Sequence, residues 1–70
     1  MNNTIMNKNL NIQIREHSYL MQMLSDALYR AKNAKTNNEY WDCIYEINLI
    51  QAEIKDTEKV IANIGVEKWN

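Results

Sequence analysis

The side chains best suited to chemistry in this chain are one histidine and one cysteine, His17 and Cys43. Each falls within a segment of helical apolar spacing. If the two segments fold back on each other near residue 35, Cys43 lies level with about residue 28 and His17 with about residue 54. That separation is too large for a nucleophile and its base. We therefore expect His17 to be a hydrogen-bonded core residue and Cys43 to be a small buried hydrophobe.

The carboxylates do not form a recognisable catalytic or metal site. Glu39, Asp42 and Glu46 lie along the start of the second predicted helix, where acidic side chains interact favourably with the helix dipole. The Glu-x-x-His pattern of helical-bundle metal sites does not occur, and one histidine with one cysteine is too few ligands for structural zinc. A single glycine leaves no glycine-rich phosphate loop. The sequence thus predicts no enzymatic activity, no cofactor and no metal site.

The elements that carry these residues are predicted to be two helices. Apolar positions recur in steps of three and four residues in both halves of the chain, which is the spacing of a helix packed at a shallow angle. In the first half these positions are Leu10, Ile14, His17, Met21, Leu24, Leu28 and Ala31. In the second half they are Cys43, Ile47, Ile50, Ile54, Thr57, Ile61 and Ile64.

The helix boundaries follow from capping signals. Thr36 and Glu39 fit a capping box, in which the Thr36 hydroxyl accepts from the Glu39 amide and the Glu39 carboxylate reaches back. Gly65 fits a left-handed helix stop. These signals predict helices over about 5–34 and 37–64. With so short a connection, the prediction is a single all-α domain over 1–70, an antiparallel two-helix hairpin.

A hairpin of 70 residues and 8.3 kDa without a disulfide has too small a core to be comfortably stable alone. The apolar arc of the first helix is also wider than one neighbouring helix requires. We therefore expect self-association, most simply a two-fold dimer that forms a four-helix bundle, or else a higher oligomer. The alternative is that some of these side chains are ordinary half-exposed residues. The expected oligomer interface comprises Leu10, Ile12, Ile14, Tyr19, Met21, Met23, Leu24 and Leu28.

A second group of large apolar side chains lies away from the isoleucine positions of the second helix. Trp41, Tyr45 and Leu49 recur every four residues, and Tyr29 lies at the same end of the hairpin. Exposed aromatic side chains are common anchors of protein interfaces, so these four residues are predicted to bind a partner protein. Three alternatives remain open: packing in the homo-oligomer, Trp41 folding over the turn as a lid, and incidental exposure.

A third group is basic. Arg30, Lys32 and Lys35 lie near the turn, beside Tyr29 and Trp41, and basic groups among aromatic rings can hold single-stranded nucleic acid. Basic residues also favour helix C-termini because of the dipole, and the acidic Glu39 and Asp42 lie beside the same turn. Nucleic-acid binding by a hairpin dimer is therefore the alternative function.

Composition narrows the class of protein further. A net charge of −1 argues against a general electrostatic grip on nucleic acid or membrane, and no apolar run is long enough to span a bilayer. The asparagine-rich start lacks a signal-peptide core, and the lone thiol suits a reducing cytoplasm. Abundant asparagine, isoleucine and lysine indicate AT-rich coding DNA. Together these features predict a non-enzymatic inhibitor or regulator of phage or plasmid type. It would act by stoichiometric binding to a host protein, for example a component of a host defence system. A further alternative is an oligomer that sequesters a small ligand, a small-ligand sponge.

Overall fold

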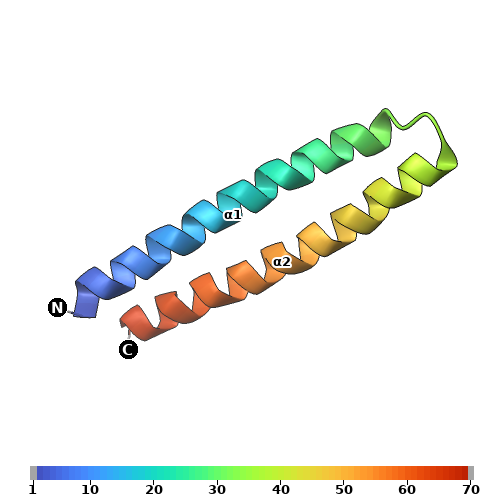
Figure 1. Cartoon of the computed structure of the whole chain (residues 1–70). Helices are drawn as coiled ribbons and strands as arrows, with labels where there is room; N and C mark the ends of the chain where they lie inside the picture. Colours follow the sequence, from blue (N-terminus) through green and yellow to red (C-terminus); the bar gives the residue numbers. More distant parts are fainter. Residues whose placement is uncertain (1, 70) are drawn as a thin grey trace.

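The computed structural model describes the backbone of residues 2–69 and the side chains of residues 8–64. Within these residues the chain forms two helices, α1 (Asn2–Lys32) and α2 (Asn37–Trp69), which run antiparallel side by side (Figure 1). The start of α1 and the end of α2 lie at the end of the hairpin opposite the connection. The predicted all-α helical hairpin is confirmed.

The connection between the helices is closed by the predicted cap. The Thr36 hydroxyl oxygen accepts a hydrogen bond from the Glu39 amide at 3.1 Å, and the Glu39 carboxylate accepts from the Lys35 amide at 3.0 Å. At the other side, the backbone amide and the side-chain amide of Asn33 both donate to the Tyr29 carbonyl. Because both ends are satisfied, four residues, 33–36, are enough to reverse the chain.

The predicted helix stop at Gly65 is wrong, since α2 continues through it to Trp69. A single glycine inside a helix costs only about 1 kcal/mol relative to alanine, which does not end a helix whose following residues can continue it. The bounds of α1 differ from the prediction by two or three residues, because it begins at Asn2 and ends at Lys32.

The core lies along the line where the two helices meet. All seven predicted positions of α2 lie there: five are buried and the last two are half-buried. The buried ones are Cys43, Ile47, Ile50, Ile54 and Thr57. The periodicity of the second half of the chain is therefore confirmed as the core side of α2.

The core side of α1 is rotated from the one predicted. Leu20 and Ala27 are buried, and the half-buried residues that continue their spacing are Leu10, Gln13, His17, Leu24, Ala31 and Ala34. Ile14, Met21 and Leu28, which were predicted to face α2, are about half exposed. The physical reason is space: small residues at 27, 31 and 34 let α1 approach the isoleucines of α2 closely where the short loop holds the helices together.

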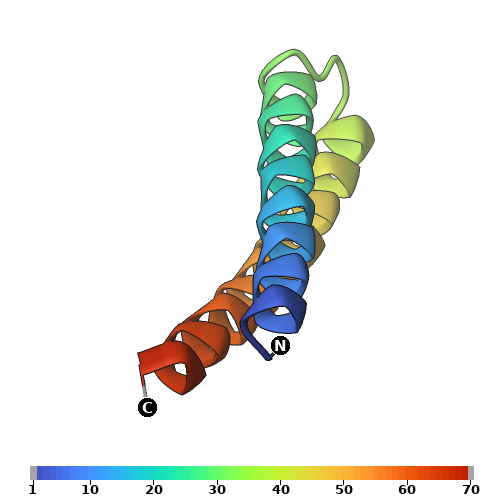
Figure 2. The same cartoon turned by 90° about the vertical axis from the view of Figure 1, so that its left-hand side faces the viewer.

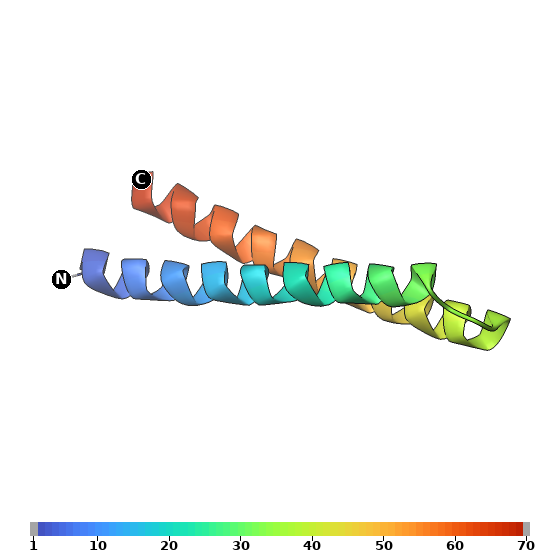
Figure 3. The same cartoon turned by 90° about the horizontal axis from the view of Figure 1, so that it is seen from above.

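The hairpin is a thin rod that measures 54 × 15 × 11 Å between Cα atoms. The helices cross at a shallow angle and separate toward the chain ends (Figures 2 and 3). Neither helix, over the residues described, is both long enough and apolar enough to cross a membrane. With a core only one layer thick, most side chains outside the contact line are exposed among residues 8–64.

Candidate protein-binding surfaces

His17 is hydrogen-bonded at the edge of the core. Its Nε2–H donates to the Glu58 carboxylate at 3.1 Å, across the two helices. Glu58 lies one turn beyond residue 54, which is the position on α2 that the sequence predicted to lie level with His17. Side chains lean toward the N-terminus of their own helix, so in antiparallel helices they meet residues that are offset along the chain. His17 thus ties α1 to α2.

Cys43 lies in the core near the turn, as a free and buried thiol. It borders a small groove with Ala34 and Asp42, whereas His17 is bonded to α2 fifteen residues further along. Among residues 8–64, no three His, Cys, Asp or Glu side chains gather closely enough to hold a metal ion. The structure does not bring the two candidate chemical residues together.

Arg30 is held by two carboxylates. Its two terminal nitrogens donate to the two oxygens of Glu46 at 3.0 Å each, and its Nε donates to Asp26 at 3.2 Å. The bidentate hydrogen bonds from Arg30, with the guanidinium charge, hold the pKa of Glu46 below its ordinary value of 4.5 and raise the pKa of Arg30. The guanidinium therefore serves as a second link between the helices.

The Arg30–Glu46 pair predicts a pH dependence of stability. Because the pKa of Glu46 is lowered by folding, the pair contributes above pH 4.5 and its contribution is lost as the pH falls through the lowered value. Glu46→Gln should therefore cause a small decrease in Tm at pH 7, and this difference from the wild type should become smaller at pH 3. Thermal denaturation followed by circular dichroism measures both. Glu53→Gln, seven residues further along α2, is the control and should not lower Tm at either pH; an equal decrease would assign the effect to net charge.

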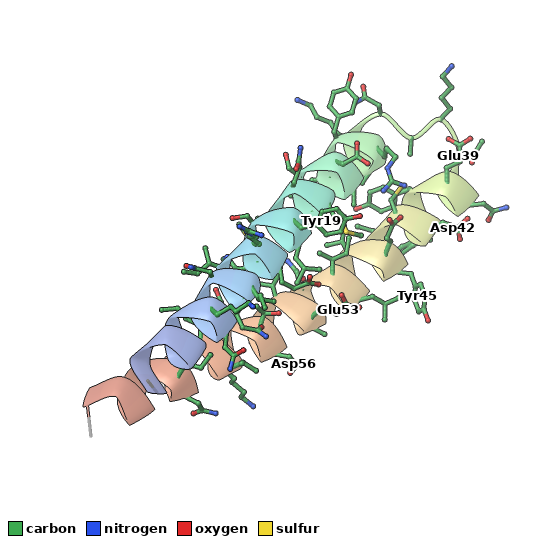
Figure 4. All side chains as sticks on the ribbon, turned by 60° about the vertical axis from the view of Figure 1, so that its left-hand side comes forward. Tyr19, Glu39, Asp42, Tyr45, Glu53 and Asp56 are labelled. Carbon is green, nitrogen blue, oxygen red and sulfur yellow. The ribbon has the colours of Figure 1, made fainter. Side chains whose placement is uncertain are left out.

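Several carboxylates lie along α2 on the side of the hairpin that carries Arg30. Glu39 and Asp42 border the groove at the turn with Arg30, and Glu53 lies two turns after Glu46 on the same side of the helix. Figure 4 shows Glu39, Asp42, Glu53 and Asp56 along α2 from the turn toward its middle. We call this side, with Asp26 of α1, the acidic face.

Three of the four residues predicted to bind a partner form one continuous surface. Trp41 and Tyr45 are 64% and 69% exposed, and Leu49, one turn further, is half exposed. They lie on the side of α2 turned away from α1, and we call them the outer α2 surface. Trp41 packs edge-on against Tyr40, with ring centroids 5.4 Å apart at 74°. Trp41 is therefore not buried against the turn.

Tyr40 was not identified from the sequence. Only its neighbour Trp41 was identified, from its spacing with Tyr45 and Leu49. A ring-to-ring contact between adjacent residues on a helix depends on their side-chain rotamers, which cannot be derived from sequence spacing. Tyr40 is 42% exposed and supports one side of the Trp41 ring.

Tyr29 is not part of the outer α2 surface. It is 68% exposed and borders the groove at the turn, together with Asp42 and Cys43 of α2. Trp41 and Tyr45 are not among the residues that line this groove. The structure therefore separates Tyr29 from Trp41, Tyr45 and Leu49, with which the sequence analysis had grouped it.

The residues predicted for the oligomer interface are divided among three places. Met23 and Leu24 pack against the core, and Leu10 is half-buried beside it. Ile14, Met21 and Leu28 are exposed on one broad face of the hairpin, which we call the Met21 face. Ile12 and Tyr19 are exposed on the opposite side of α1. They therefore do not form a single surface.

The predicted basic group is weakened as a nucleic-acid site by its surroundings. Lys32 and Lys35 are exposed at the turn, but Arg30 is engaged by Glu46 and Asp26. Glu39 and Asp42 line the groove at the turn together with Arg30, and carboxylates at that position repel phosphate groups. Comparison of the chain with protein-family models, with curated proteins and with solved structures found no match.

Proposed function

We propose that this chain is a non-enzymatic protein-binding module that uses the outer α2 surface to bind another protein. The observation that carries the proposal is the large exposure of Trp41 and Tyr45 on the side of α2 that α1 does not cover. Such rings contribute much contact area while only two side-chain torsions are ordered on binding. They are typical of residues that dominate the free energy of binding.

The surroundings of this surface indicate the chemistry of the partner. Tyr45 lies on the same side of α2 as Asp42 (Figure 4), and Glu53 lies one turn beyond Leu49. An apolar stripe beside carboxylates fits an apolar groove that has basic residues along one rim. The helix would lie in that groove through positions spaced by four residues.

Stoichiometric binding by so small a chain suits an inhibitor or regulator of a host protein, and the AT-rich bias of the sequence is compatible with a phage or plasmid origin. The free Cys43 thiol suits action in the reducing cytoplasm. The nucleic-acid alternative has less support, because Arg30 is already paired. Its signature would be binding that weakens steeply as the salt concentration rises.

The proposal predicts that Trp41→Ala/Tyr45→Ala loses its protein partner and keeps its fold. A photoreactive amino acid at position 45 would first capture the partner from a low-GC bacterial lysate, and titration calorimetry with the purified partner would then measure affinity. Two central aromatic anchors carry roughly 2 kcal/mol or more each, so the dissociation constant should rise by a factor of about 1,000.

The matched control for this experiment is Tyr19→Ala/Tyr29→Ala, which removes two exposed tyrosines from α1. It should bind the partner as the wild type does. Equal affinities for the wild type and the Trp41→Ala/Tyr45→Ala variant, or equal losses in both double variants, would contradict the assignment of this surface.

A further inference from the structure

We propose that a second copy of this chain packs against the Met21 face, with the two α1 helices antiparallel across a two-fold axis at Met21. The result is a four-helix bundle whose centre is made by Ile14, Met21 and Leu28 of both copies. This inference rests on the Met21 face and on the charges of the opposite face, and it is independent of partner binding by the outer α2 surface.

The first observation is the spacing of the exposed residues. Ile14, Met21 and Leu28 are seven residues apart, so they lie in one line along α1, and each is about half exposed. Ser18 and Ser25 lie one turn after Ile14 and Met21 along the outer margin of this line. Side chains this small allow another helix to approach closely. A hydrophobic line with small neighbours is typical of a helix that has a second helix beside it.

The second observation is the distribution of charge between the two broad faces. Beside Met21 and Leu24, the groove between the helices is completed by Asn48, Gln51 and Ala52, with Lys55 as its charged residue. The opposite face carries Asp26, Glu39, Asp42, Glu46 and Glu53, of which Asp26 and Glu46 are paired with Arg30, so that Glu39, Asp42 and Glu53 have no guanidinium partner within residues 8–64. A two-fold interface brings each surface against itself, so the acidic face would place carboxylates against carboxylates. Charge therefore selects the Met21 face for self-association.

The third observation is length. Ile14, Met21 and Leu28 span fourteen residues of α1, or about 21 Å along the helix, and the hairpin itself is 54 Å long. A second copy laid antiparallel therefore contacts an extended line of α1 and not the turn alone.

The apolar residues also determine the direction of packing. The exposed apolar line belongs to α1, whereas the α2 side of the groove is polar at Asn48 and Gln51. Apolar contact is therefore made when α1 packs on α1 of the second copy. Two-fold symmetry about Met21 then places Ile14 beside Leu28 of the second copy and Met21 beside its own equivalent.

Solution mass tests the interface. The wild type should have twice the mass of one 8.3 kDa chain, and Met21→Glu should raise the dimer dissociation constant by roughly 100-fold or more, because both copies would bury a carboxylate. Tyr45→Glu, on the outer α2 surface, is the matched control and should stay dimeric. Analytical ultracentrifugation over a concentration series measures all three. A monomeric wild type, or a dimer lost with Tyr45→Glu and kept with Met21→Glu, would overturn the proposal.

Cysteine crosslinking tests the direction of packing, including the case in which Met21→Glu fails to fold. In a Cys43→Ala background, Met21→Cys should form a disulfide-linked dimer on oxidation. Ile14→Cys alone should not, since its equivalent would lie about 21 Å away, fourteen residues along a helix. A mixture of Ile14→Cys and Leu28→Cys should form the mixed disulfide. A disulfide between two Ile14→Cys chains would show parallel α1 helices and would contradict the proposed arrangement.

Discussion

Ile50→Ala is expected to abolish the folded hairpin at 37 °C. Ile50 is 4% exposed and lies in the middle of the core, in one cluster with Leu20, Ala27, Ile47 and Ile54. Truncating a buried isoleucine to alanine costs about 2–5 kcal/mol, from lost burial and from the cavity left behind. A single core of this size rarely supplies more than about 3–5 kcal/mol in total. One substitution therefore removes most or all of the stability.

The neighbouring residue provides the matched control. Leu49→Ala removes the same number of carbon atoms one position earlier on the same helix, but Leu49 is half exposed on the outer α2 surface. Its cost should be about 0.5 kcal/mol or less. Circular dichroism during urea unfolding, at equal protein concentrations, measures the difference. Similar losses for the two variants would contradict the assignment of Ile50 to the core and Leu49 to the surface.

The sequence was sufficient to predict the features that depend on local chemistry. The Thr36–Glu39 cap forms within four residues of chain, so its residues specify it wherever the helices lie. The core side of α2 was also predictable, because an isoleucine at nearly every third or fourth position leaves one continuous apolar line. The helical hairpin follows from these two features.

The core side of α1 was not predictable in the same way, because α1 contains two overlapping lines with the same spacing. Leu10, His17, Leu24 and Ala31 belong to both lines. One line is completed by Ile14, Met21 and Leu28, and the other by Gln13, Leu20, Ala27 and Ala34. Hydrophobicity favours the first line, whereas the space left by the isoleucines of α2 favours the second. The fit between the two helices determines which line of α1 faces α2, and this fit cannot be derived from the periodicity of one helix.

The candidate binding surfaces were only partly predictable from the sequence, for the same reason. The sequence identified Trp41 and Tyr45 correctly as residues outside the core line of α2, but it grouped them with Tyr29, which belongs to α1 and borders the groove at the turn. Helical spacing places a residue around its own helix, whereas the relation between two helices depends on how they pack. The division of Ile14 from Ile12 between two sides of α1 has the same origin. Surfaces made by one helix were therefore easier to predict than those made by both.

Ala27→Leu is expected to destabilise the hairpin strongly, although leucine is an excellent helix former. Ala27 is 0% exposed, whereas Leu28 is 51% exposed, so the helices are closest at the smaller side chain. Three additional carbon atoms at position 27 would push α1 away from Ile47 and Ile50. Overpacking of this kind costs about 1–3 kcal/mol, and a core one layer thick has no second layer into which it can relax. Most of the cooperative unfolding transition should be lost.

The control for Ala27→Leu is Ala62→Leu, the same substitution at an exposed position of α2. It should change the free energy of unfolding by less than about 0.5 kcal/mol. Thermal and urea unfolding are compared at one protein concentration, because assembly would make Tm depend on concentration. If α1 instead met α2 through Ile14, Met21 and Leu28, position 27 would lie at the margin of the core. Ala27→Leu would then be neutral or stabilising, and that result would overturn the rotated core side of α1.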